Sequence, residues 1–284
     1  MANTITQAFV QQFQDNLIHL AQQKGSRLRG SVNEQSVTGE KFHFERLGNV
    51  AAVQKTTQHT TTPVLDVPHS RRTATMLDFH WADLIDSEDK VRMLVNPDSH
   101  YAKSGASSMM RAIDDIIIAA ALGNAVDGDG SNVALPAGQK IAHGSAGLTL
   151  AKLIETKEIL DGNDVDPDEE RFIVLGSKQV SNLLNTTEVK SADYNSIKAL
   201  VQGDIDTFMG FKFLRSERLS LATTTRSCFA FTKGAMGLGI GSDVKTKIDE
   251  RPDKSYAHQV YLSFTAGATR VQDECVVQVD CSEA

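Results

Sequence analysis

Cysteine is scarce in this 284-residue chain, and its three residues, Cys228, Cys275 and Cys281, form no C-x-x-C pair. The sequence therefore gives no support for a thiolate zinc site, and a reducing compartment is the natural setting. If Cys275 and Cys281 share a strand, they lie about 20 Å apart, too far to bridge. The eight histidines do not cluster at ligand spacing, so we expect no metal site.

A basic surface and a long apolar run are also missing. The net charge is −7 and the pI is about 5.6, which argues against a general nucleic-acid binder. The longest apolar stretch is far shorter than the ~18 residues that span a bilayer, so we expect no membrane segment. The N-terminus lacks the basic start and apolar core of a signal peptide.

Motifs for catalysis are absent as well, and we predict no catalytic residue and no cofactor. The glycine-rich stretch Gly234–Gly241 leaves one alternative, a soluble enzyme that binds a nucleotide there. Its spacing, G-x-x-G-x-G-x-G, is not the dinucleotide fingerprint, and close backbone packing explains the glycines better. Asp127–Gly130 begins like a calcium loop, but Gly138 stands where the loop needs an acidic ligand.

One long helix is the element around which the chain is organised. Asn96 is a suitable N-cap and Pro97 a suitable first residue for a helix that reaches Gly123, roughly 40 Å in all. Residues 116–122 are apolar on all sides, so we expect them to be buried all round, and Gly123 and Asn124 to end the helix in a left-handed conformation. An apolar stripe supports the helix: Ala106, Met110, Ile113, Ile117 and Ala120.

Before this helix, the pattern predicts an amphipathic arm and then a weak β ribbon. Residues 4–24 have the period of a helix whose apolar face must dock on its own domain or on a neighbour. Residues 41–47 alternate as a strand does, whereas 54–62 are β-prone but almost without core residues. Such a strand pair cannot stand alone in water. The ribbon is mildly basic and the following segment acidic, so the two could attract each other between copies.

After the helix, strands and helices mix without a βαβ rhythm, which favours an α+β fold. The expected helices are 148–160, a helix from Ser177 as its cap to about 184, and 192–201. The expected strands are 171–176, 208–215 and 228–231, followed by a turn at 248–253 around Pro252. An antiparallel pair, 259–264 with 271–279, is expected to turn through Gly267.

This order of elements resembles the major capsid proteins of tailed bacteriophages of the Hong Kong 97 type. The segment Arg171–Leu184, RFIVLGSKQVSNLL, is similar to sequences found in that family. A second similar segment is Gly203–Phe213. Many proteins of the family have here a glycine, a short turn, a Gly-Phe pair, a strand and then a serine. In this chain the Gly-Phe pair is Gly210 and Phe211, and the serine is Ser216.

The resemblance implies an N-terminal arm (1–30), an extended loop lying over a neighbouring subunit (31–77), a peripheral domain with the spine helix (78–135 and 255–284) and an axial domain (136–254). It implies a non-enzymatic protein that self-assembles into an icosahedral phage head around double-stranded DNA. A nanocompartment shell of the same fold, or a tail or connector protein, is the alternative within this structural class.

The resemblance also implies partners. These are further copies of the chain in hexamers and pentamers, a portal, a separate scaffolding protein, and packaged DNA held without sequence-specific contact; a decoration protein is compatible. The location would be the virion, after assembly in the host cytoplasm. We expect charge reversal at Arg71 and Arg72 to impair assembly more than folding. The candidate subunit-interface residues are Phe9, Phe13, Lys41, Arg46, Lys55, Arg71, Arg72, Asp83 and Asp86.

Overall fold

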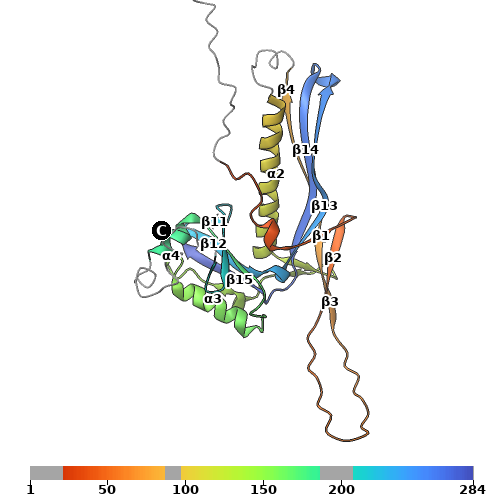
Figure 1. Cartoon of the computed structure of the whole chain (residues 1–284), viewed down its shortest axis with the longest axis vertical. Helices are drawn as coiled ribbons and strands as arrows, with labels where there is room; N and C mark the ends of the chain where they lie inside the picture. The colour runs from red at the N-terminus through yellow and green to blue at the C-terminus, as the bar shows by residue number, and fades with distance from the viewer. Residues whose placement is uncertain (1–21, 87–96, 186–206, 284) are drawn as a thin grey trace, which may run out of the picture. The chain divides into compact units, whose positions relative to one another are not determined.

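The structure is a computed structural model that describes residues 22–86, 97–185 and 207–283 (Figure 1). The chain divides into two compact units. The first contains 78–111 and 242–265, and the second contains 26–77, 112–241 and 266–284. Of the expected helices, 192–201 and nearly all of 4–24, with Phe9 and Phe13, lie outside the described residues. Residues 22–24 form no helix.

Helix α2 (Pro97–Leu122) confirms the long helix. Ile113, Ile117 and Ala121 are at most 1% exposed, but Ala119 is exposed, so the expectation that 116–122 is buried all round is wrong. The helix presents one broad buried face instead. The left-handed ending is also wrong, because the only positive-φ glycines among the described residues lie elsewhere. The Gly123 N–H donates to the Ala119 carbonyl at 2.8 Å, and a Cβ at Gly123 would lie 2.5 Å from that oxygen.

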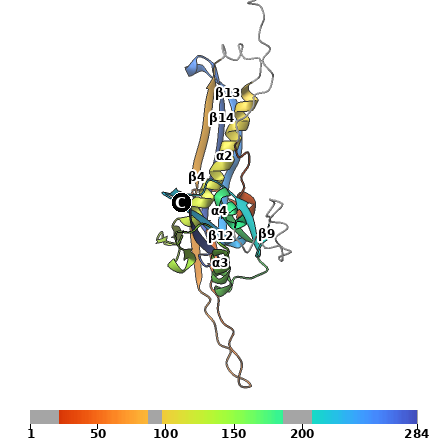
Figure 2. The same cartoon turned by 90° about the vertical axis from the view of Figure 1, so that its left-hand side faces the viewer.

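One four-stranded sheet has the order β1-β13-β14-β4, and Figures 1 and 2 show α2 running alongside β13 and β14. Within the first unit, Gly105 of α2 allows a close approach: a Cβ there would lie 2.6 Å from Leu262 and 2.7 Å from Trp81. Phe79 stacks on Phe264 with ring centres 4.9 Å apart. The strands are β1 (Asn33–Ser36), β4 (Leu77–Ile85), β13 (Met236–Arg251) and β14 (Ala257–Arg270).

The expected hairpin through Gly267 is wrong. Gly267 lies inside β14, and β15 (Val276–Ser282) belongs to another sheet. This glycine is required for a different reason, because a Cβ would lie 2.3 Å from the Thr75 carbonyl oxygen. The expected turn at 248–253 begins later than predicted, since β13 continues to Arg251 and the chain turns through η5 (Pro252–Lys254), Ser255 and Tyr256.

The second unit contains a seven-stranded sheet of order β7-β15-β12-β8-β10-β9, with β11 paired to β12. Strand β8 is wholly buried, as its unbroken apolar run predicts. Phe172 and Phe229 lie 5.6 Å and 5.4 Å from Phe231, ring centre to ring centre. The strands are β7 (Lys140–Ile141), β8 (Arg171–Leu175), β9 (Thr207–Phe208), β10 (Phe211–Arg215), β11 (Leu221–Ala222) and β12 (Thr225–Thr232).

Two helices accompany this sheet, α3 (Leu150–Gly162) and α4 (Ser177–Leu184). Both were expected, but Gly176 rather than Ser177 occupies the N-cap of α4, and the Ser177 N–H donates to Glu217. On α3, the apolar side chain of Ile154 is 50% exposed. The expected strand 208–215 divides into β9 and β10 because Met209 and Gly210 take positive φ values of 55° and 88°.

The C-terminal segment after β15 is tied to this unit through Glu283. Its carboxylate accepts a hydrogen bond from Arg226, and Gln179 donates to it at 2.9 Å. The bond from Arg226 is the main reason that the pKa of Glu283 lies below its ordinary value. The stabilisation is therefore complete above the ordinary glutamate pKa and is lost as the pH falls through the lowered value.

The third sheet has the order β2-β3-β5-β6 and carries the extended loop. Its strands are β2 (Lys41–Leu47), β3 (His69–Thr75), β5 (Ala125–Asp127) and β6 (Asn132–Val133). Short 3-10 turns complete the described secondary structure: η2 (Arg29–Ser31), η3 (Ala137–Gln139) and η4 (Lys233–Ala235). All three cysteines are buried and free, and none of the described helices is long and apolar enough to cross a membrane.

We predict that Ile117→Asp abolishes the folded subunit. Ile117 is 0% exposed, and an unpaired carboxylate there costs on the order of 5 kcal/mol, comparable to a domain's whole stability. Ala119→Asp, which introduces the same group on the exposed side of the same helix, should leave the subunit folded. Circular dichroism and yield of soluble protein measure both. A soluble, helical Ile117→Asp subunit would show that α2 is not a core helix.

Candidate functional site

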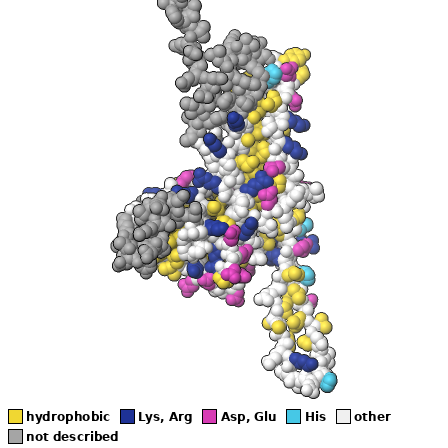
Figure 3. Space-filling view, viewed as in Figure 1, with side chains coloured by type: hydrophobic (Ala, Val, Ile, Leu, Met, Phe, Trp, Pro, Cys, Tyr) yellow, Lys and Arg dark blue, Asp and Glu magenta, His cyan; other side chains and the backbone are white. Residues whose placement is uncertain are grey.

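The most exposed described part of the chain is the extended loop between β2 and β3. The two strands pair in register from Lys41 with Thr75 to Leu47 with His69, and the Gly48 N–H donates to Pro68 at 2.8 Å. Beyond this point residues 51–68 are all exposed and form no strand. Figure 3 shows hydrophobic side chains along this segment. The exposed apolar residues are Leu47 (70%), Val53 (60%), Val64 (95%), Leu65 (43%) and Val67 (37%).

At the base of the loop, a phenylalanine packs directly on backbone. Phe44 is buried, and a Cβ added to Gly237 would lie 2.2 Å from its ring. Gly237 and Gly239 lie in strand β13 rather than in a loop, and Gly239 faces Val37. The packing explanation for the glycine-rich stretch is therefore confirmed. An extended, largely buried strand cannot wrap around a phosphate, so the nucleotide alternative loses its binding loop.

A buried cluster of charges lies at the same base. Arg72, 3% exposed, donates from Nη2 to Asp273 Oδ2 at 2.6 Å and lies 3.7 Å from Asp127. The other Asp273 oxygen accepts from Nε of Arg270, which is 0% exposed. Arg270 also donates to the carbonyls of Ala121 (3.1 Å) and Gly123 (2.8 Å), at the end of α2. One carboxylate thus joins the loop to the spine helix.

The other arginines of the ribbon are also paired within the chain. Arg46 donates to the Val271 carbonyl at 2.9 Å and to Ser70 at 3.2 Å. Arg71 lies 3.3 Å from Glu45, and both side chains are about half exposed or more. Arg72 was expected at an interface between subunits. The structure corrects this, because a buried side chain bonded to Asp273 does not face a neighbour.

The remaining candidate interface residues are divided between the two units. Lys41 and Lys55 are exposed on the ribbon in the second unit. Asp83 and Asp86 belong to the first unit; Asp86 is exposed, and Asp83 accepts the Leu84 N–H at 2.9 Å.

Sequence reasoning missed Asp114, a buried carboxylate in α2. It accepts hydrogen bonds from Ser26 Oγ (2.5 Å) and from the N–H groups of Arg27 and Leu28 (both 3.1 Å). The carboxylate thereby anchors the chain where the N-terminal segment reaches the second unit. A signal was present, since Asp114 interrupts an otherwise apolar helix face between Ile113 and Ile117.

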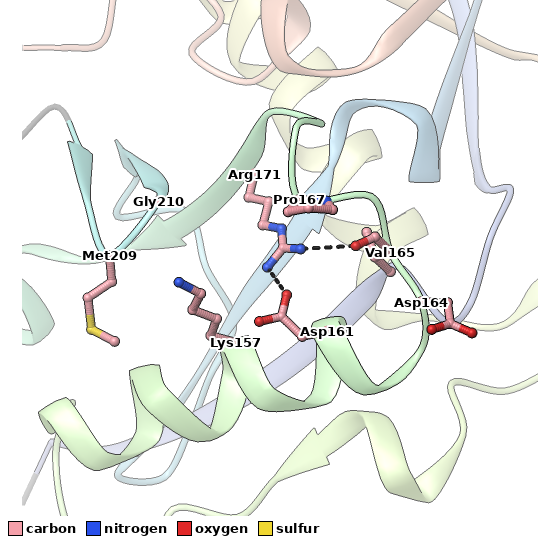
Figure 4. A pocket seen from close by; sticks show the side chains of 8 residues that line it. All are labelled: Lys157, Asp161, Asp164, Val165, Pro167, Arg171, Met209 and Gly210. Carbon is pink, nitrogen blue, oxygen red and sulfur yellow. Dashed lines mark hydrogen bonds and ion pairs between the residues drawn. The ribbon is translucent and has the colours of Figure 1, made fainter.

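A surface pocket of about 510 Å³ lies between α3 and the β9–β10 turn (Figure 4). Its central cation, Arg171, is bonded to Asp161 at 2.7 Å and to the Val165 carbonyl at 3.1 Å. The pocket therefore offers paired charges rather than a nucleophile beside a base. No group of metal-ligating side chains occurs among the described residues.

A family model described as phage capsid protein matches residues 5–283. The chain belongs to this family. It is a major capsid protein, a building block of a phage shell. Comparison with curated proteins finds no match.

Solved phage capsids have the same fold. The capsid structure of cyanophage P-SCSP1u is 16% identical with a TM-score of 0.77, covering 100% of this chain and 96% of that chain. The capsid of Ralstonia phage GP4 is 8% identical (TM-score 0.76; 96% and 95% covered), and Mycobacterium phage Che8 is 16% identical (0.71; 95% and 97%). The expected α+β, Hong Kong 97-like fold is confirmed.

We predict that Gly237→Ala destabilises the subunit by about 1–3 kcal/mol, because the added methyl group must displace the Phe44 ring. Gly138→Ala is the control, since a Cβ there meets nothing within 4 Å. Urea unfolding measures both. ATP should not raise the melting temperature of the unmodified protein, and a clear rise would restore the nucleotide alternative.

We also predict that the two neighbouring arginines respond differently to charge reversal. Arg71→Glu breaks an exposed pair worth less than about 1 kcal/mol. Arg72→Glu places a buried carboxylate against Asp273 and should cost about 3–5 kcal/mol. The midpoint of urea unfolding gives both values. Equal losses would contradict the assignment of Arg72 to the interior.

Proposed function

We propose that this capsid protein forms a closed icosahedral shell of hexamers and pentamers that encloses double-stranded phage DNA. The observation that carries the proposal is the extended loop, whose apolar side chains are exposed and have no core of their own. Leaving apolar surface in water costs roughly 25 cal/mol per Å², so a neighbouring copy that covers the loop gains that free energy.

A shell follows from the way in which such a contact repeats. The loop of one copy docks on a different surface of the next, which is a heterologous contact, and such contacts close when the rotation between copies closes. The free energy of each contact can be small, because many identical contacts act together in a shell. The net charge of −7 limits nonspecific attraction between the shell and DNA.

We further propose that the charged residues Lys41, Lys55, Arg71, Asp83 and Asp86 lie at contacts between copies, together with Phe9 and Phe13 of the arm. The proposed regions are the arm 1–30, the loop 31–77, the peripheral domain (78–135, 255–284) and the axial domain (136–254). The role is structural rather than enzymatic. A separate scaffolding protein and a portal are proposed partners, with assembly in the host cytoplasm.

Electron microscopy of the protein, coexpressed with a neighbouring scaffold gene, tests the proposal. Closed shells are the expected result, and nucleic acid inside particles from infected cells separates a virus head from a nanocompartment. Rings or tubes would indicate a tail or connector protein. Small discrete particles in the presence of scaffold would contradict the proposal.

The loop gives a sharper prediction. Val64→Asp should leave the unfolding midpoint unchanged, because the side chain is 95% exposed, but should lower the yield of shells at least tenfold. A charge buried in the contact is costly unless it is paired. Ile154→Asp introduces the same group at a half-exposed site on α3 and is the control. Shell yield by sedimentation compares the two, and equal yields would remove the loop from the contact.

A further inference from the structure

We propose that Arg72, through Asp273, is a positioning residue that sets the direction of the extended loop and contributes little to folding. The proposal rests on the proposed function, because the direction of the loop matters where the loop must meet a neighbouring copy. It is carried by the attachment of the ribbon, by the charge balance around Asp273 and by the length of the loop beyond it.

The two strands of the ribbon are attached to one turn. From β2, Arg46 Nη1 donates to the Val271 carbonyl at 2.9 Å, and from β3, Arg72 Nη2 donates to Asp273 at 2.6 Å. The turn itself is held, since the Val271 N–H donates to the Ala235 carbonyl at 2.8 Å and the Val276 N–H to the Asp273 carbonyl at 3.2 Å. With both strands attached to a fixed turn, the ribbon has a defined direction. With one attachment only, the ribbon could rotate about that point.

The charge balance shows that Arg72 is not needed to neutralise Asp273. Arg270 already donates to that carboxylate and is otherwise satisfied by backbone carbonyls. Arg72 adds a second buried cation, whose other carboxylate neighbour, Asp127, is partly exposed and 3.7 Å away. The Nε and Nη1 atoms of Arg72 have no hydrogen-bond partner among the described residues. Burying a cation with unmade hydrogen bonds is unfavourable, so an apolar replacement at this position is tolerated in folding.

Toward the tip, Arg72 is also the last residue of β3 that pairs with a strand other than β2. Strand β3 pairs with β5 only at Arg72 and Thr73, and residues 69–71 pair with β2 alone. From Arg72 to Val64 the chain can extend roughly 25 Å at ~3.3 Å per residue. A small rotation at the base therefore becomes a large displacement at the apolar tip.

The experiment compares Arg72→Met with Arg171→Met. Arg171 is a matched control, because it is also buried (5% exposed), pairs with an aspartate, and has an unpartnered Nε, but it lies in β8 away from the ribbon. Spin labels at Leu47→Cys and Ile154→Cys report the ribbon against α3, and both sites are exposed. The three native cysteines are buried and should not take the label.

We expect Arg72→Met to broaden the distribution of label distances at least twofold in the free subunit and to lower shell yield at least tenfold. Arg171→Met should leave the distribution unchanged and the yield within twofold. An unchanged distribution in Arg72→Met overturns the proposal, as does a broadened distribution with normal shells. If the unmodified protein forms no shells, the proposed function fails, while the distance measurement still tests the attachment.

Folding is tested in the same variants. The thermal midpoint of Arg72→Met should stay within a few degrees of the unmodified protein, and an unfolded variant would show that Arg72 is a folding residue, which overturns the proposal. Arg46→Met is the second variant, because Arg46 is only partly buried and holds the other strand. It should also broaden the distribution, and an unchanged one would contradict the two-point attachment.

Discussion

The carboxylate of Asp273, held between two buried arginines, is the interaction on which the rest of the second unit depends. It connects β3, the turn after β14 and, through Arg270, the carbonyls at the end of α2 and the Val133 carbonyl of β6. A charge at this depth is tolerated only with its partners in place. The loop, the helix end and the two strands therefore meet at one carboxylate.

Arg270 also explains how the long helix ends without a left-handed residue. The last carbonyls of a helix carry partial negative charge and lack partners within the helix. Here a guanidinium 147 residues further along the chain donates to the Gly123 carbonyl, while the Gly123 N–H closes the last turn on Ala119. Nothing near Gly123 in the sequence indicates this partner, so the local expectation of a glycine cap was reasonable and wrong.

Contacts between residues far apart in the chain also explain which features the sequence predicts and which it does not. Local patterns located α2, α3, α4 and β8 to within about two residues, since period and capping are short-range properties. The expected hairpin at Gly267 was wrong, because this glycine lies inside β14, where the Thr75 carbonyl, far away in the chain, closely approaches it. Arg71 and Arg72 are identical in type and adjacent, yet one is exposed and the other buried. Adjacent strand residues face opposite sides, and Arg72 is the one that pairs with the buried Phe44 and reaches Asp273, 201 residues away.

Assembly gives a reason for combining a rigid base with an exposed tip. Ordering a segment on binding costs conformational entropy, which is subtracted from the free energy that its contacts supply. A loop whose base already has a fixed direction loses less entropy than one that swings freely, so the same apolar tip binds a neighbour more tightly. The tip remains irregular and does not add a long β edge that would pair with the wrong copy. In the proposed assembly, the buried charges at the base would fix the direction of the loop, and the exposed valines at the tip would supply its apolar contact.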